Sequence, residues 1–360
     1  MTSVNSTGFY KAVKSRRYAY DSEQVARLLV QVDEGRVDAL AQALSAYIRA
    51  NLPATINRRS GLGDYRTNPY VLVASATLMG LSDPKKFADF LFNNKLYMGL
   101  ETSFGKSIEA VVGQYPVSGA KWQDPPEKVA ESAALAGLSQ EEKARRRTVS
   151  VWREVDKSCV AGNRRYLVGV KSGPNDINDT QVEAMKEAIA NHHAAWMQET
   201  RRNHPSVTEL DIVLGITYGT DSTTNNKENQ ILVKLLEHGF EEEDRERKPG
   251  VLIESQAKRV RVYRRVGQEF WSFIGNPANP ANSAFVYLEV LLALARALSQ
   301  GMKTGSLEES VNRKIVQLTQ SLQKLMLPPQ SLPDWIRNSF STDELFWLTT
   351  AMTAFFDEGI

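Results

Sequence analysis

The middle of the chain alternates between apolar runs and amphipathic segments. The runs YLVGVKS (166–172) and ELDIVLGITYG (209–219) are short and nearly continuous, as expected of buried strands, and TVSVWREV (148–155) and RVRVYRRV (259–266) alternate with a period of two. Helical spacing marks 179–199 and 229–240 instead. Residues 148–275 therefore predict the order β-β-α-β-α-β, which is an α/β core with a mixed sheet. Residues 239–250, which precede the last strand, predict a solvated loop.

The flanking regions predict helices on both sides of this core. The expected division is a helical region at 1–147, the α/β core at 148–279 and a second helical region at 280–360. The apolar positions that recur every three or four residues predict separate helices at 21–32, 37–52, 83–96, 102–114 and 138–147.

Composition narrows the possible classes of protein. The 360 residues include 44 basic and 42 acidic side chains, so a surface for nucleic acid must be a local patch. A single cysteine, Cys159, excludes an internal disulfide and any cysteine-rich zinc site. No apolar signal core opens the sequence, and no run approaches the roughly 20 apolar residues of a membrane helix. These features predict a cytoplasmic protein.

Candidate chemistry begins at Lys171, which ends an apolar strand. If 149–157 and 165–172 form a hairpin, Asp156 and Lys171 lie on adjacent strands near one sheet edge. The alternative is a lysine that extends its ammonium group into solvent from the strand end.

An aspartate followed by a strand-borne x-x-K is the pattern of the PD-(D/E)XK nucleases. Four stretches resemble a subgroup of type II restriction endonucleases in that superfamily, in the same order. They are NPYVLVASATLMG (68–80), ETSFGKSIEAVV (101–112), VKSGPNDINDTQV (170–182) and VGQEFWSFIGNP (266–277). The resemblance implies a PD-(D/E)XK core with a mixed sheet flanked by helices.

The resemblance also implies the site and its cofactor. It assigns Asp156 as a catalytic acid that binds the metal and Lys171 as the catalytic lysine. Glu109 is a further carboxylate for Mg²⁺. The alternative for Glu109 is an ordinary solvated glutamate. The motif usually has an acid two residues before the lysine, where this chain has Gly169. Glu183 on the next helix could supply that acid as a metal ligand, although Thr180–Glu183 also reads as a capping box. Gln181, on the first turn of the same helix, is a further catalytic candidate.

A basic strand is the best candidate for DNA contact. Its residues are Lys258, Arg259, Arg261, Tyr263 and Arg265, and a period of two places the last four on one face. The alternative is an edge strand with protective charges. The KSGPN stretch adds Ser172 and Asn175 as candidate DNA contacts.

The implied function is a Mg²⁺-dependent type II restriction endonuclease. It would act as a homodimer on both strands of a short double-stranded DNA sequence, which a cognate DNA methyltransferase also recognises. Two alternatives remain: a repair or recombination nuclease without base specificity, and a non-catalytic DNA-binding protein with a decayed nuclease core.

Overall fold

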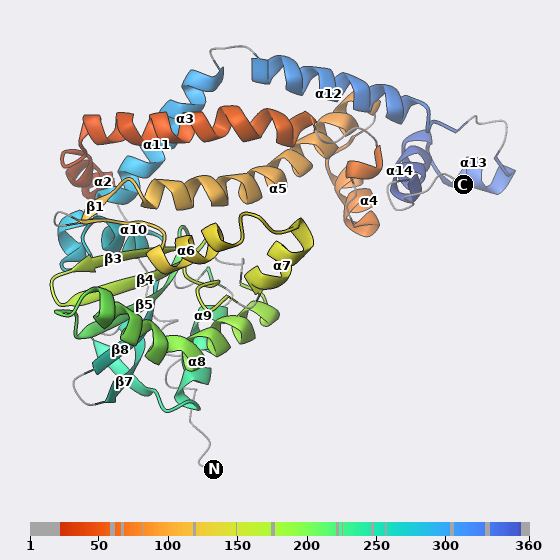
Figure 1. Ribbon diagram of the computed structural model, residues 1–360. Helices are drawn as coiled ribbons and strands as arrows, with labels where there is room; N and C mark the ends of the chain where they lie inside the picture. Colours follow the sequence, from red (N-terminus) through yellow and green to blue (C-terminus); the bar gives the residue numbers. More distant parts are fainter. Residues whose placement is uncertain are drawn as a thin grey trace. The chain divides into compact units, whose positions relative to one another are not determined.

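The chain folds into two compact units that each combine separate parts of the sequence. One unit contains residues 1–43 and 105–294, and the other contains 44–104 and 295–360. The predicted division at 147 and 279 follows the chain in order and stays a prediction. The computed structural model (Figure 1) describes residues 22–57, 62–65, 68–81, 83–117, 120–148, 150–173, 177–220, 223–224, 226–245, 248–255, 258–302, 306–327 and 332–353.

A six-stranded mixed sheet organises the first unit, in the order β3-β4-β5-β8-β7-β6. β4 pairs in parallel with β5, and β5 in parallel with β8, whereas the β3–β4, β7–β8 and β6–β7 pairs are antiparallel. The strands are β3 (Lys157–Ala161), β4 (Arg164–Lys171), β5 (Glu209–Ile216), β6 (Glu241–Arg245), β7 (Lys248–Ser255) and β8 (Lys258–Val266). This arrangement confirms the predicted α/β fold with a mixed sheet.

Helices cover the sheet on both faces because neighbouring strand residues point to opposite sides. Leu167 and Val262 join the core formed with α8 (Asp179–Asn203) and α9 (Lys227–Leu236). On the other face Tyr166 and Tyr263 contact Phe273 of α10 (Gln268–Gly275), with ring centroids 5.5 and 6.3 Å apart. The α8 and α10 helices thus lie against opposite faces (Figure 1).

Further helices and two short strands complete the chain. They are α2 (Ser22–Leu29), α3 (Glu34–Asn57), the 3₁₀ helix η1 (Leu62–Tyr65), α4 (Pro69–Leu78), α5 (Pro84–Val112), β1 (Pro116–Val117), β2 (Ala120–Lys121), α6 (Pro126–Ala134), α7 (Gln140–Thr148), the 3₁₀ helix η2 (Pro280–Ser283), α11 (Val286–Met302), α12 (Ser306–Gln323), α13 (Asp334–Ser339) and α14 (Thr342–Thr353). In the second unit Phe87 packs against Phe346, and the Trp347 indole donates to the Leu81 carbonyl at 2.6 Å.

Three sequence-based predictions of local structure are wrong. The strand predicted at 148–155 is absent from its described residues: Thr148 ends α7, and Trp152 and Val155 enter the core three residues apart, on one side of a turn. The predicted loop at 239–250 contains β6 and begins β7, and the acidic β6 is an edge strand, where charge discourages pairing with other chains. The predicted helices at 83–96 and 102–114 are one helix, α5, because glycine inside a helix costs only about 1 kcal/mol.

One segment, Pro280–Ser299, is long and apolar enough to cross a membrane by length and composition, contrary to the prediction that no run approaches that length. Its Glu289 is fully buried, however, and lies 2.9 Å from the Arg36 guanidinium. A fully buried glutamate that pairs with an arginine of the same unit is typical of a helix packed in a folded protein, so this segment is only weak evidence for a membrane span.

Candidate active site

A tight turn carries the chain from α7 to β3 and fixes the candidate catalytic aspartate. Trp152 is buried, and the Trp196 indole of α8 donates to the Val151 carbonyl at 3.2 Å. The Val155 N–H donates to the Trp152 carbonyl at 3.1 Å. Two core side chains and these hydrogen bonds therefore hold the residues directly before Asp156 in place.

Asp156 lies against β4, next to the strand end that carries Lys171. Its backbone N–H donates to the Val168 carbonyl at 2.8 Å, and its Oδ2 accepts the Val170 N–H at 2.7 Å. The Nζ of Lys128, from α6, lies 3.6 Å from Asp156 Oδ1. The hairpin turns at Gly162 and Asn163, so the predicted neighbourhood of Asp156 and Lys171 on adjacent chain segments is present in the structure.

Glu109 reaches the same place from α5, far away in the sequence. It is half-buried, and its pKa is raised, first by burial and then by the negative charge of Asp156. The cations Lys157, Lys128 and Lys171 act in the opposite direction on the same pKa. The charges around Asp156 therefore act on Glu109, and its role as a ligand stays a prediction.

The surroundings of position 169 leave room only for glycine. A Cβ atom there would lie 2.8 Å from the carbonyl oxygen of Glu154, closer than Cβ atoms approach backbone atoms in proteins. Gly169 and Lys171 share a strand face, so the 150–155 turn occupies the space in which an acid at position 169 would begin. With this backbone, β4 can carry only glycine at that position.

We expect Gly169→Ala to destabilise the first unit by about 1–3 kcal/mol, because a backbone oxygen cannot rotate away as a side chain can. Asp156 directly follows the displaced turn, so DNA cleavage should fall as well. Thermal unfolding measures the first effect. Gly137→Ala is the matched control, since a Cβ at Gly137 meets nothing within 4 Å. Equal melting temperatures for the two variants would contradict the close approach.

The α8 candidates are engaged elsewhere. The capping box joins Asn178 and Gln181, not Thr180 and Glu183, so the predicted box is wrong by two residues. Asn178 can cap a helix as well as Thr180 can, and its backbone N–H donates to Gln181 Oε1 at 3.0 Å. Glu183 instead contacts Lys234 of α9 and Lys186, and hydrogen bonds from both lower its pKa.

The basic strand β8 lies inside the sheet between β5 and β7, so the edge-strand alternative is wrong. Its Arg261 is 3% exposed and contacts Glu209 at 2.9 Å, Glu243 at 3.3 Å and Asp211 at 3.7 Å. Burial raises the pKa of Asp211, although Arg164 and Arg261 oppose that change. These groups form an ion network on the α10 face of the sheet.

The other β8 residues that were predicted to contact DNA lie in or beside this ion network. Arg259 contacts Glu243 at 2.8 Å and Glu254 at 2.9 Å, and the Tyr263 hydroxyl donates to Asp211 at 3.0 Å. Arg265 lies over the Tyr263 ring, 4.5 Å from its centroid, and donates to the Arg264 carbonyl at 3.0 Å. Within the described part of the chain, Arg265 is thus the one arginine of the predicted set that contacts no carboxylate. Contact of β8 with DNA stays a prediction.

Of the remaining candidates, Ser172 directly follows β4. Ser172 is partly buried, and its carbonyl accepts the Thr217 hydroxyl at 2.7 Å. Asn175 and the side chain of Lys258 lie outside the described residues.

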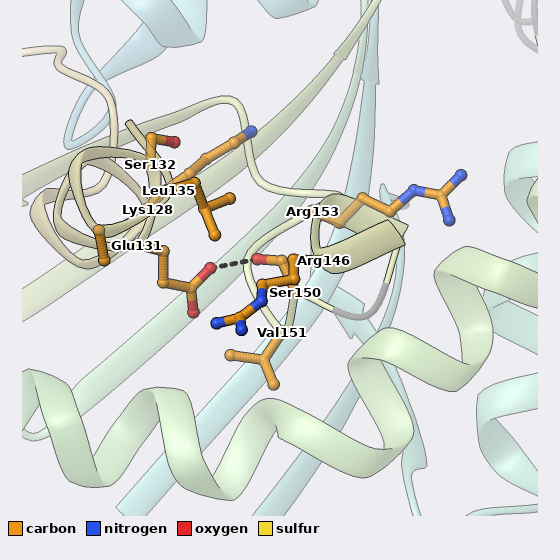
Figure 2. A pocket seen from close by; sticks show the side chains of 9 residues that line it. Lys128, Glu131, Ser132, Leu135, Arg146, Ser150, Val151 and Arg153 are labelled. Atoms are coloured by element: carbon orange, nitrogen blue, oxygen red, sulfur yellow. Dashed lines mark hydrogen bonds between the residues drawn. The ribbon is translucent and has the colours of Figure 1, made fainter. Parts of the chain in front are cut away.

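A pocket of about 520 Å³ lies beside the turn that precedes Asp156, and residues of α6, α7 and positions 150–153 line it. Figure 2 shows the Glu131 carboxylate hydrogen-bonded to the Ser150 hydroxyl, while the Arg153 guanidinium points away from them. Lys128 lines this pocket and also contacts Asp156. The pocket therefore adjoins the candidate active site without sharing its carboxylates.

The carboxylate oxygens of the candidate active site are the kind of ligand that a hard divalent cation prefers. Among the described residues no three histidine, cysteine, aspartate or glutamate side chains are arranged to hold a metal ion. Mg²⁺, however, is commonly held by one or two carboxylates together with water and substrate phosphates. Asp156 is one such oxygen donor, and Glu109 is the candidate second one, since burial and the negative charge of Asp156 both raise its pKa.

Comparison with known protein families gives a match that covers the middle of the chain. Residues 141–246 match the model of a family described as "Type II restriction endonuclease EcoO109I". A search of curated proteins found no match. The matched range contains Asp156 and Lys171 but neither Glu109 nor β8. The resemblance to type II restriction endonucleases is thereby confirmed, and the mixed sheet flanked by helices is consistent with a nuclease core.

Proposed function

We propose that this protein is a magnesium-dependent type II restriction endonuclease. It hydrolyses phosphodiester bonds in both strands of a short, specific sequence of double-stranded DNA. The observation that carries the proposal is the position of Asp156 against β4, next to the strand end that carries Lys171, in a chain whose residues 141–246 match the restriction endonuclease family. Glu109 is near enough for the charge of Asp156 to raise its pKa. Glu109 comes from a different part of the chain, so local sequence pattern cannot account for its place.

The three side chains have distinct roles in the proposed reaction. Asp156 and Glu109 would hold Mg²⁺, which lowers the pKa of an attacking water and polarises the scissile phosphate. Lys171 supplies a fixed ammonium group that offsets negative charge developing on the phosphate. The Val170 N–H fixes the Asp156 carboxylate through its 2.7 Å hydrogen bond, so the acid and the lysine are positioned by the same strand.

A homodimer is the simplest assembly for cutting both strands, because two-fold symmetry of the DNA site is then matched by two-fold symmetry of the protein. On β8 we assign DNA contact first to Arg265, whose guanidinium contacts no carboxylate among the described residues. Arg259 and Arg261 would have to leave ion pairs with Glu243 before they could bind a phosphate.

One observation favours a second candidate function. The steric block at Gly169 removes an acid from the usual motif, which is expected of a DNA-binding protein with a decayed nuclease core. Such a protein would bind DNA without cutting it. A repair or recombination nuclease without base specificity would cut, but without preferred positions.

We expect the purified protein to cut phage DNA into discrete fragments when Mg²⁺ is present, and electrophoresis measures the result. EDTA should abolish cleavage, since the carboxylates alone do not activate water, while Ca²⁺ should support DNA binding without cleavage. A continuous smear would support the nuclease without base specificity. Binding without cleavage would support the decayed core, and full cleavage in EDTA would contradict the proposed mechanism.

A further inference from the structure

Position 169 carries no acid, but Glu154 lies next to it in the fold. A Cβ atom at residue 169 would lie only 2.8 Å from the carbonyl oxygen of Glu154. The side chain of Glu154 therefore starts close to the place at which an acid on β4 would start. Sequence pattern gives no sign of this, because the two residues are 15 positions apart and approach only through the fold of the turn.

The carboxylate of Glu154 also faces the catalytic lysine. Its Oε2 lies 3.8 Å from Lys171 Nζ, and its Oε1 lies 3.3 Å from Arg153 Nε. The Glu154 side chain is only 14% exposed. A carboxylate so little exposed is costly unless cations compensate its charge, and here the two cations are Lys171 and Arg153.

The turn holds Glu154 firmly in this position. Its neighbours Trp152 and Val155 are both buried, and their hydrogen bond fixes the peptide between them. Glu183 is placed differently, because Lys186 and Lys234 hold it on the α8–α9 side. Among the described residues, Glu154 is the acid that contacts Lys171.

We propose that Glu154 supplies the carboxylate absent from Gly169 and that Glu154 and Asp156 together hold a divalent cation beside Lys171, a pair of carboxylates of the kind that commonly holds Mg²⁺. This inference rests on the proposed function and adds a residue to it. The carboxylates of Glu154 and Asp156 now pair with Lys171 and Lys128, at 3.8 and 3.6 Å. A divalent cation would therefore compete with these lysines for the same oxygen atoms.

The test is Mn²⁺ binding to the full-length protein, measured by the loss of the free-ion signal in electron paramagnetic resonance. Glu154→Gln keeps the shape of the side chain and removes its charge. It should weaken Mn²⁺ binding by about tenfold or more and slow Mg²⁺-dependent DNA cleavage by about 100-fold. Glu154→Asp keeps the charge and should recover part of both. Glu187→Gln is the control, because the Glu187 side chain is 64% exposed on α8, and both measurements should match wild type.

The outcomes separate this inference from the proposed function. Slower cleavage with unchanged Mn²⁺ binding would mean that Glu154 only positions Lys171, and the cation-site assignment would be overturned. The same holds if Glu183→Gln, and not Glu154→Gln, weakens Mn²⁺ binding. If wild-type protein binds Mn²⁺ and cuts DNA while Glu154→Gln equals it in both, the inference fails and the proposed function stands. A wild type that neither binds Mn²⁺ nor cuts DNA would overturn both.

Discussion

Lys171→Ala and Asp156→Asn should each lower the rate of DNA cleavage by about 100- to 1,000-fold, which is roughly 3–4 kcal/mol of transition-state stabilisation. Lys171→Ala removes the ammonium group without adding bulk. Asp156→Asn keeps the side-chain shape and its acceptor for the Val170 N–H, while removing the charge that a divalent cation needs. Single-turnover cleavage of a DNA fragment with one cut site measures the rate.

The melting temperature should change little in either variant, because both side chains are partly exposed, at 19% for Lys171 and 22% for Asp156. Asp179→Asn is a matched control for the loss of charge, since the Asp179 side chain is 85% exposed at the start of α8. Wild-type rates in both Lys171→Ala and Asp156→Asn would show that the active site lies elsewhere.

Arg261→Ala should destabilise the first unit by about 3–5 kcal/mol, as removal of one partner from a buried ion network does. The arginine is 3% exposed, and its loss would leave Asp211, which is 2% exposed, and Glu209 with less compensating charge. Thermal or urea unfolding followed by circular dichroism measures the change.

Arg265→Ala provides the comparison within the same strand. Its guanidinium contacts a ring and a carbonyl, so its loss should affect stability far less than the loss of Arg261. If Arg261→Ala instead left stability unchanged and made the salt dependence of DNA binding shallower by about one unit, Arg261 would be a phosphate contact.

The buried strands could be predicted because their signal is local. The runs that form β4 and β5 are apolar almost throughout, and β8 alternates along its length, so each indicates a strand without knowledge of its neighbours. The edge strand β6 could not be found in this way. Its residues are acidic, and what makes it a strand is its pairing with β7.

The site was predictable only where family resemblance or chain proximity applied. Both point to Asp156 and Lys171, and resemblance alone points to Glu109; the catalytic roles of all three stay predictions. Glu154 was missed because residues 148–155 alternate as a strand would, whereas two of them, Trp152 and Val155, enter the core and form a turn. The contact of Glu154 with Gly169 depends on that turn, and sequence spacing does not encode it.

The close approach of Glu154 to Gly169 also limits the evolutionary routes open to this sequence. An aspartate or glutamate introduced at position 169 by a single codon change would bring its Cβ against the Glu154 carbonyl oxygen. An acid could return to the strand only after the 150–155 turn had moved, and that turn is anchored by the buried Trp152 and Val155. Positions 169 and 152–155 should therefore covary in homologues: a residue larger than glycine at position 169 should accompany a turn of different length or composition.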